Sequence, residues 1–245
     1  MISNDHSHAA AATTAPTVDG LGNSRRSFLR SAGIAGAALA LAGCGSSAAE
    51  LTAPTKQNEP SGAVVNPDGS ITLDFSTDID VLNYAYALEQ LEAAFYVTAV
   101  SNAAFGTIFS ASEQRVLRDI RDHEVVHKDF FAAALGALKI PNLTPKFGAI
   151  SFGDRTSVLQ TAKTFEDLGV SAYNGAAKYL ASEAYLGLAG KIVSVEARHA
   201  SAIRDILNPR SADFAPNAYD AGNTPSFVLA AASAFIVESI TAINT

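Results

Sequence analysis

Residues 110–136 read SASEQRVLRDIRDHEVVHKDFFAAALG and contain the features that decide the fold. Ser110, followed three residues later by Glu113, forms the capping-box pattern of a helix start, and a glycine closes the stretch as a typical helix stop. Between them, apolar residues recur in steps of three and four, which is the period of a helix with one buried face. That face carries Glu124 and His127 near its middle. The stretch therefore predicts an amphipathic helix with a Glu-x-x-His pair facing inward.

The same pair occurs a second time, and two further helical segments carry one glutamate each. Residues 183–207 contain Glu196 and His199, which form the second Glu-x-x-His pair. Segments at about 77–103 and 154–181 each contain a glutamate followed seven residues later by a tyrosine. These pairs are Glu89 with Tyr96 and Glu166 with Tyr173. The chain order Glu, Glu-x-x-His, Glu, Glu-x-x-His predicts two helical hairpins that pack into an all-α four-helix bundle.

Every predicted inner face is apolar except for these carboxylates and imidazoles. Burying an unpaired carboxylate or imidazole is unfavourable, so such groups need partners. When four helices bring acidic groups to the same level, the negative charges repel one another. Only bound cations can balance them. The chain has one cysteine, Cys44, which excludes a cysteine-based metal site. The sequence therefore predicts a carboxylate-rich two-metal site inside the bundle.

This ligand order resembles that of the ferritin-like superfamily, whose di-iron and di-manganese bundles use the same residue types. The stretches at 80–85 (DVLNYA) and 91–96 (LEAAFY) are most similar to one branch, the bacterial ferritin-like domain proteins and plant desiccation-related proteins. The similarity covers roughly residues 75–243. It implies that two Fe ions, or two Mn ions, bind to six ligands: Glu89, Glu124, His127, Glu166, Glu196 and His199.

The resemblance also implies roles for individual residues. Glu124 and Glu196 would bridge the two metals, and each histidine would bind one of them. Tyr96 and Tyr173, the candidate catalytic tyrosines, would donate hydrogen bonds that orient the ligands.

Some neighbouring residues leave alternatives open. Glu92 lies one turn from Glu89 and is an alternative ligand, although the shared spacing to a tyrosine favours Glu89. His123 is adjacent to Glu124 but about 100° around the helix, which favours a surface or supporting position. The remaining acidic residues are interpreted as a helix cap, a helix-start charge and a solvated group: Glu113, Glu183 and Glu238.

The C-terminal part is expected to add one helix to the bundle. After a loop rich in Pro, Asn and Gly at 208–225, an apolar helix is predicted from about Ser226 to Ile243. It is short for a membrane span, so we expect it to pack against the bundle. Alternating apolar residues at 71–75 predict a short extended piece.

The N-terminal region has the features of an export signal. Paired arginines at 25 and 26, followed by x-Phe-Leu, resemble a twin-arginine signal. The apolar run at 32–42 fits the core of a signal peptide and is too short for a stable membrane anchor. The run ends in LAGC, which resembles the lipobox of bacterial lipoproteins and implies a lipid anchor at Cys44. Cleavage after Ala49 is the alternative.

We therefore expect a signal with lipobox at 1–44, a flexible tether at 45–75 and the bundle domain at 76–245. The expected location is the periplasm or cell envelope, reached in the folded state. The net charge is −7, and no basic cluster follows residue 44, which argues against nucleic-acid binding. A homo-oligomer is compatible with this interpretation.

The site predicts a di-metal oxidoreductase that oxidises Fe(II) or reduces peroxide or O2, with a role in stress response. Two other functions fit the sequence: a metal-binding protein without turnover, and a protective envelope protein of stress or desiccation. The sequence does not decide whether the protein is an enzyme.

Overall fold

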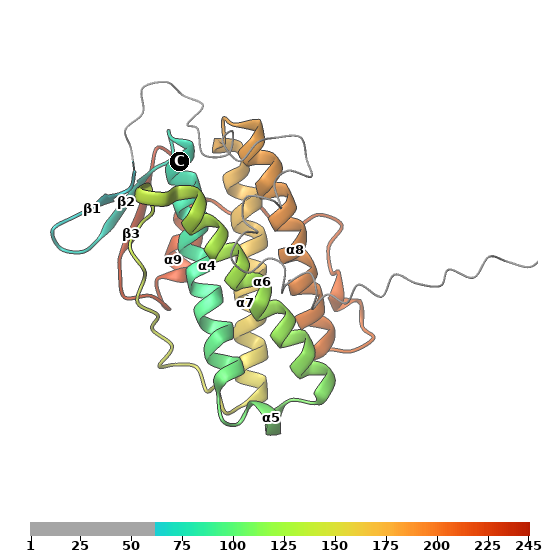
Figure 1. The fold of residues 1–245 in the computed structure, drawn as a ribbon. Helices are drawn as coiled ribbons and strands as arrows, with labels where there is room; N and C mark the ends of the chain where they lie inside the picture. Colours follow the sequence, from blue (N-terminus) through green and yellow to red (C-terminus); the bar gives the residue numbers. More distant parts are fainter. Residues whose placement is uncertain (1–61) are drawn as a thin grey trace, which may run out of the picture. The chain divides into compact units, whose positions relative to one another are not determined.

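The computed structural model describes residues 62–245, and the predicted signal at 1–44 lies outside the described residues. Four long helices run side by side as a bundle in this part of the chain (Figure 1). Their bounds are α4 (Asp78–Ser101), α6 (Ala111–Leu135), α7 (Arg155–Ala176) and α8 (Glu183–Leu207). The predicted all-α, ferritin-like bundle is thus confirmed.

The helices pack in two pairs. The most extensive contacts join α4 to α6 and α7 to α8, as expected for two successive helical hairpins. The core between them is apolar and partly aromatic. The ring of Phe95 lies 5.1 Å from that of Phe165 and 5.0 Å from that of Tyr96, both in edge-on geometry. Such pairs stabilise a core beyond the area that they bury, and they fix how α4 and α7 approach.

The helix starts follow local rules that the sequence displays. Ser110 and Glu113 form the capping box of α6, and the Asp154 side chain accepts the backbone N–H of Ser157 at the start of α7. Glu113 also forms an ion pair with Arg155. The interpretation of Glu113 as a helix cap is confirmed. Its ion pair additionally connects α6 to α7. Gly136 ends α6 with φ = 56°, a conformation that favours glycine.

Shorter elements complete the connections in the described part of the chain. They are α5 (Phe105–Ile108), η2 (Gly136–Leu138), η3 (Ala177–Tyr179) and η4 (Ala212–Phe214).

A small sheet contains the predicted extended piece. β2 (Ile71–Asp74) pairs with β1 (Val64–Val65) in antiparallel fashion and with β3 (Ile240–Ile243) in parallel, so β2 is the central strand. Ile71, Leu73 and Phe75 are buried. The structure differs here from the prediction of a flexible tether. The last residues of that predicted tether form the strands β1 and β2, which pack on the domain.

The predicted C-terminal helix over 226–243 is wrong in its second half. α9 (Pro225–Ala232) ends after eight residues, and the chain then continues to β3. Glu238 lies between them and accepts hydrogen bonds from the backbone N–H and the hydroxyl of Thr144. The interpretation of Glu238 as a solvated group is therefore also corrected. Although its hydrogen bonds are exposed, Glu238 holds the segment before β3 against a loop that is distant in the sequence.

None of the helices within residues 62–245 combines the length and apolar character needed to cross a bilayer.

Candidate metal centre

The bundle brings all six predicted ligands into its interior. Glu89 comes from α4, Glu166 from α7, and the two Glu-x-x-His pairs come from α6 and α8. The four glutamates are fully buried, and the side chains of His127 and His199 are 12% and 5% exposed. The spacing of each Glu-x-x-His pair explains why both of its side chains point inward, because residues three apart lie on the same helix face.

The six side chains form two overlapping groups in which the candidate ligand atoms lie within 4.8 Å of one another. One group contains Glu89 and His127, and the other contains Glu166 and His199. Glu124 and Glu196 belong to both groups. Two neighbouring positions that share two carboxylates are the arrangement expected of bridging ligands.

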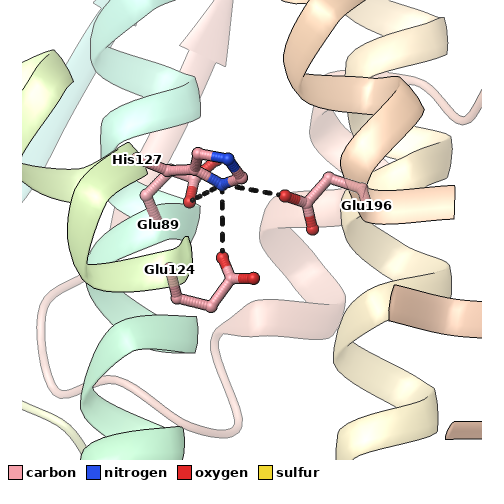
Figure 2. Close-up of side chains that lie close together, drawn as sticks. All are labelled: Glu89, Glu124, His127 and Glu196. Carbon is pink, nitrogen blue, oxygen red and sulfur yellow. Dashed lines mark ion pairs between the residues drawn. The ribbon is translucent and has the colours of Figure 1, made fainter. Parts of the chain in front are cut away.

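The contacts around each imidazole show the same convergence. Nδ1 of His127 lies 3.0 Å from Glu196 Oε1, 3.4 Å from Glu89 Oε2 and 3.6 Å from Glu124 Oε2 (Figure 2). Nδ1 of His199 is likewise 2.8 Å from Glu124 Oε1 and 3.4 Å from Glu166 Oε2. One N–H cannot satisfy three carboxylate oxygens. Each cluster therefore has more acceptors than its imidazole can serve.

Unsatisfied buried atoms concentrate at this centre. Ten buried side-chain N or O atoms lack a hydrogen-bond partner in the described part of the chain, and eight of them belong to the six residues. Unpartnered buried polar atoms are rare in folded proteins and point to an additional group. Carboxylate oxygens and imidazole nitrogens are donors that suit Fe(II) and Mn(II). The residues thus fit two such ions.

Tyr96 and Tyr173 each fix one of the two glutamates that belong to a single group, here called the outer glutamates, Glu166 and Glu89. Each tyrosine lies on the helix opposite its glutamate. The Tyr96 hydroxyl donates to Glu166 Oε1, and the Tyr173 hydroxyl donates to Glu89 Oε1, both at 2.5 Å. Burial, and then the neighbouring glutamates, raise the pKa of both tyrosines well above the usual range, so both remain hydrogen-bond donors. Each glutamate keeps its Oε2 for the centre.

In the metal-free centre, protons take the place of cations. Burial is the main reason that the pKa values of Glu89 and Glu166 are raised to about 8. For Glu124, burial would raise the pKa, but the close imidazoles of His127 and His199 lower it to about 2. For His199, burial would lower the pKa, but the surrounding glutamates raise it to about 12. Ions that bind here displace these protons.

Two residues whose roles the sequence left open, His123 and Glu92, lie beside the six candidate ligands. Nδ1 of His123 is hydrogen-bonded to Nε2 of His199 at 2.9 Å, and His123 is half-buried. This contact leaves Nδ1 of His199 directed at the carboxylates, so His123 has the supporting position. Glu92 is buried but belongs to neither group, whereas Glu89 belongs to the first. The roles of all these residues in metal binding stay predictions.

Comparison with known proteins supports the fold. A search of curated protein sequences gave no significant match. The family model of the ferritin-like domain matches residues 77–209, which is more than half of the chain. The matched region spans the four long helices and all six predicted ligands. It does not test the similarity to the desiccation-related branch. The chain belongs to the ferritin-like domain family.

Proposed function

We propose that the bundle binds two Fe or Mn ions and uses them to oxidise Fe(II) or to reduce peroxide or O2. The observation that carries this proposal is the set of eight unpartnered N and O atoms that face one another from four helices. Glu89 and His127 would hold one ion, and Glu166 and His199 the other. The carboxylates of Glu124 and Glu196 would be shared.

Charge balance supports two divalent ions. Four buried carboxylates carry four negative charges, and two divalent cations carry four positive charges. Removing ions from water is costly unless the buried set is compensated. Two divalent cations with two neutral histidines give a neutral centre, which the apolar surroundings favour.

The residues around the centre position the ligands and keep bulk water away. When bound, adjacent Fe or Mn ions supply one-electron changes at two neighbouring positions, as two-electron reduction of O2 or peroxide requires. The tyrosine hydroxyls fix the outer glutamates. The four glutamates are fully buried, which keeps bulk water away from the centre. Without ions, Glu89 and Glu166 hold protons near neutral pH, because burial raises their pKa values to about 8, and these protons leave when ions bind.

Replacing the two shared ligands tests the site. We expect the wild-type protein to carry two tightly bound ions per chain, and Glu124→Ala with Glu196→Ala to lose both, as measured by elemental analysis of purified protein. A matched control is Asp119→Ala with Glu183→Ala, which removes two exposed carboxylates from the same two helices. Two tightly bound ions in the first double variant would contradict the assignment.

Oxidation is tested separately on the wild-type protein. Fe(II) is added without oxygen, and O2 is then admitted while absorbance is recorded. A spectral change in the wild type, absent from the Glu124→Ala, Glu196→Ala variant, supports the redox function. Two bound ions with no oxidation would reduce the function to metal binding.

We also propose that the protein works in the cell envelope, held there by a lipid on Cys44. The paired arginines, the apolar run and the position of the single cysteine support this proposal. Changing both Arg25 and Arg26 to Lys should leave the protein in the cytoplasm, as judged by cell fractionation. Changing Arg115 and Arg118 to Lys is the control with unchanged charge. Equal export of both variants would refute the proposal.

A further inference from the structure

An apolar cavity lies inside the bundle, next to the proposed centre. Its wall is formed by the first half of α4, the ends of α6 and α7, and the start of α8. On α4, the wall residue Leu88 directly precedes Glu89. On α6, the wall residue Phe131 lies one helical turn after His127. On α7, the wall residue Tyr173 donates its hydroxyl hydrogen bond to Glu89. The cavity therefore lies beside the ion position that Glu89 and His127 would form.

The two hairpins of the bundle are related by a numerical correspondence in the sequence. Adding 77 to the numbers of Glu89 and Tyr96 gives Glu166 and Tyr173, so α4 and α7 are equivalent helices. The cavity wall joins the start of α4 to the end of α7, so these two helices run in opposite directions. Equivalent positions thus lie at opposite ends of the bundle, on either side of the centre.

At the other end, aromatic side chains fill the equivalent space. By the same shift, Phe95 corresponds to the cavity residue Ala172. Phe165 corresponds in the same way to Leu88. Phe95 and Phe165 are both buried, and their rings lie 5.1 Å apart in edge-on geometry. Ala172 leaves free the space that Phe95 occupies in the other half. One end of the bundle is therefore closed by aromatic rings, whereas the other end keeps a cavity.

The size and the chemistry of the cavity select its occupant. The cavity has a volume of about 20 Å³, which is room for one small molecule. Its wall is apolar apart from tyrosine hydroxyls, and the hydroxyl of Tyr173 is bonded to Glu89. Within residues 62–245, the one buried side-chain atom of the wall without a partner is the hydroxyl of Tyr84. A buried water needs about two to four such partners. Peroxide is equally polar, whereas O2 is apolar and needs none.

We propose that this cavity holds O2 beside the ion position of Glu89 and His127, and that O2 rather than peroxide is the oxidant at the centre. This proposal rests on the proposed redox function. On the side away from the centre, the wall residues Ala177 and Leu188 are partly exposed, so the cavity lies between the surface and the centre. O2 thus reaches the centre from one end of the bundle, because Phe95 and its aromatic neighbours close the other.

The position of O2 can be mapped by NMR, because dissolved O2 is paramagnetic and speeds up the relaxation of nearby methyl groups. The full chain is freed of metal with a chelator, and its Leu and Val methyl groups are labelled with carbon-13. Methyl relaxation is then compared under O2 and under N2. We expect a several-fold larger enhancement at the buried wall residues Val81 and Leu88 than at Leu117, which is equally buried but lies outside the cavity wall.

Ala172→Phe fills the cavity by copying the aromatic side chain of the other half. It should abolish the relaxation enhancement at Leu88 and slow the oxidation of Fe(II) by O2 several-fold. Oxidation by hydrogen peroxide should stay at the wild-type rate. Circular dichroism shows whether the variant folds. If it does not, Ala172→Val is compared with Ala162→Val, because Ala162 is a buried alanine of the same helix outside the cavity wall.

The outcomes separate this inference from the proposed function. Equal enhancement at Leu88 and Leu117 in the wild type overturns the O2 position and leaves the two-metal function standing, since elemental analysis measures the ions independently. A folded Ala172→Phe that reacts with O2 at the wild-type rate also overturns it. Equal slowing of the reactions with O2 and with hydrogen peroxide overturns the choice of O2 as the oxidant. A wild type that binds two ions but oxidises no Fe(II) under O2 contradicts the redox function and this inference together.

Discussion

At the scale of single residues, each outer glutamate of the centre has two oxygens in different surroundings. Oε1 of Glu166 accepts the hydroxyl of Tyr96, whereas Oε2 has no hydrogen-bond partner in the described part of the chain. Glu89 and Tyr173 repeat this arrangement. The tyrosines therefore stabilise one oxygen and leave the other available for an ion.

Removing one tyrosine hydroxyl should destabilise the protein. Tyr96→Phe and Tyr173→Phe each leave a buried glutamate oxygen without its donor, which costs about 1–3 kcal/mol. Denaturant unfolding of metal-free protein measures this change. Tyr219→Phe is the control, because Tyr219 is 90% exposed. An effect no larger than that of the control would show that the two hydrogen bonds do not contribute.

At the scale of elements, the C-terminal segment joins the two ends of the folded chain. β3 pairs with β2, and Ile236 forms a bridge with Pro145 in the loop before α7. The Glu238 carboxylate accepts two hydrogen bonds from Thr144 of the same loop. Burial alone would raise the pKa of Glu238, but these hydrogen bonds lower it.

Glu238→Ala should loosen this segment and leave the bundle intact. We expect the free energy of unfolding to fall by about 1 kcal/mol, because the lost hydrogen bonds are solvent-exposed. Amide hydrogen exchange should become faster in β3 and stay unchanged at the centres of α4 and α7. Asp220→Ala, which removes an exposed carboxylate, is the control. Unchanged exchange in β3 would contradict the role given to Glu238.

At the scale of the whole molecule, the buried centre links stability to pH. The pKa values of Glu89 and Glu166 are raised from 4.5 to about 8 in the folded protein. The folded state therefore binds more protons than the unfolded state between these values. This contribution to stability is fully present below pH 4.5 and is lost as the pH rises through 8. The raised pKa of His199 acts in the same direction above 6.5.

Metal-free protein should thus melt at a lower temperature at pH 8 than at pH 5. Added Mn²⁺ should reverse this trend, because ions replace the protons and bind the folded state selectively. Differential scanning calorimetry with and without Mn²⁺ measures both effects. Glu89→Gln with Glu166→Gln should flatten the pH dependence of the metal-free protein. A melting temperature that rises with pH in metal-free wild type would contradict the expectation.

The sequence by itself determined the four long helices and the chain order of the candidate ligands. Helix caps such as Ser110 with Glu113 are local, and the spacing of Glu124 and His127 fixes a helix face without knowledge of the partners. These features depend on residues within a few turns of one another. They could be predicted for that reason.

Only the tertiary structure decided the contacts between distant segments. The residues before β3 are apolar and fit a helix locally, but β3 is a strand because β2, far away in the sequence, offers its free edge. Likewise, the Glu92 carboxylate of α4 lies against Gly169 of α7, where an added Cβ would be only 3.0 Å from Glu92 Oε1. Pairing of distant backbone and the packing of facing helices leave no signal in a local pattern, so they become visible only once the chain is folded.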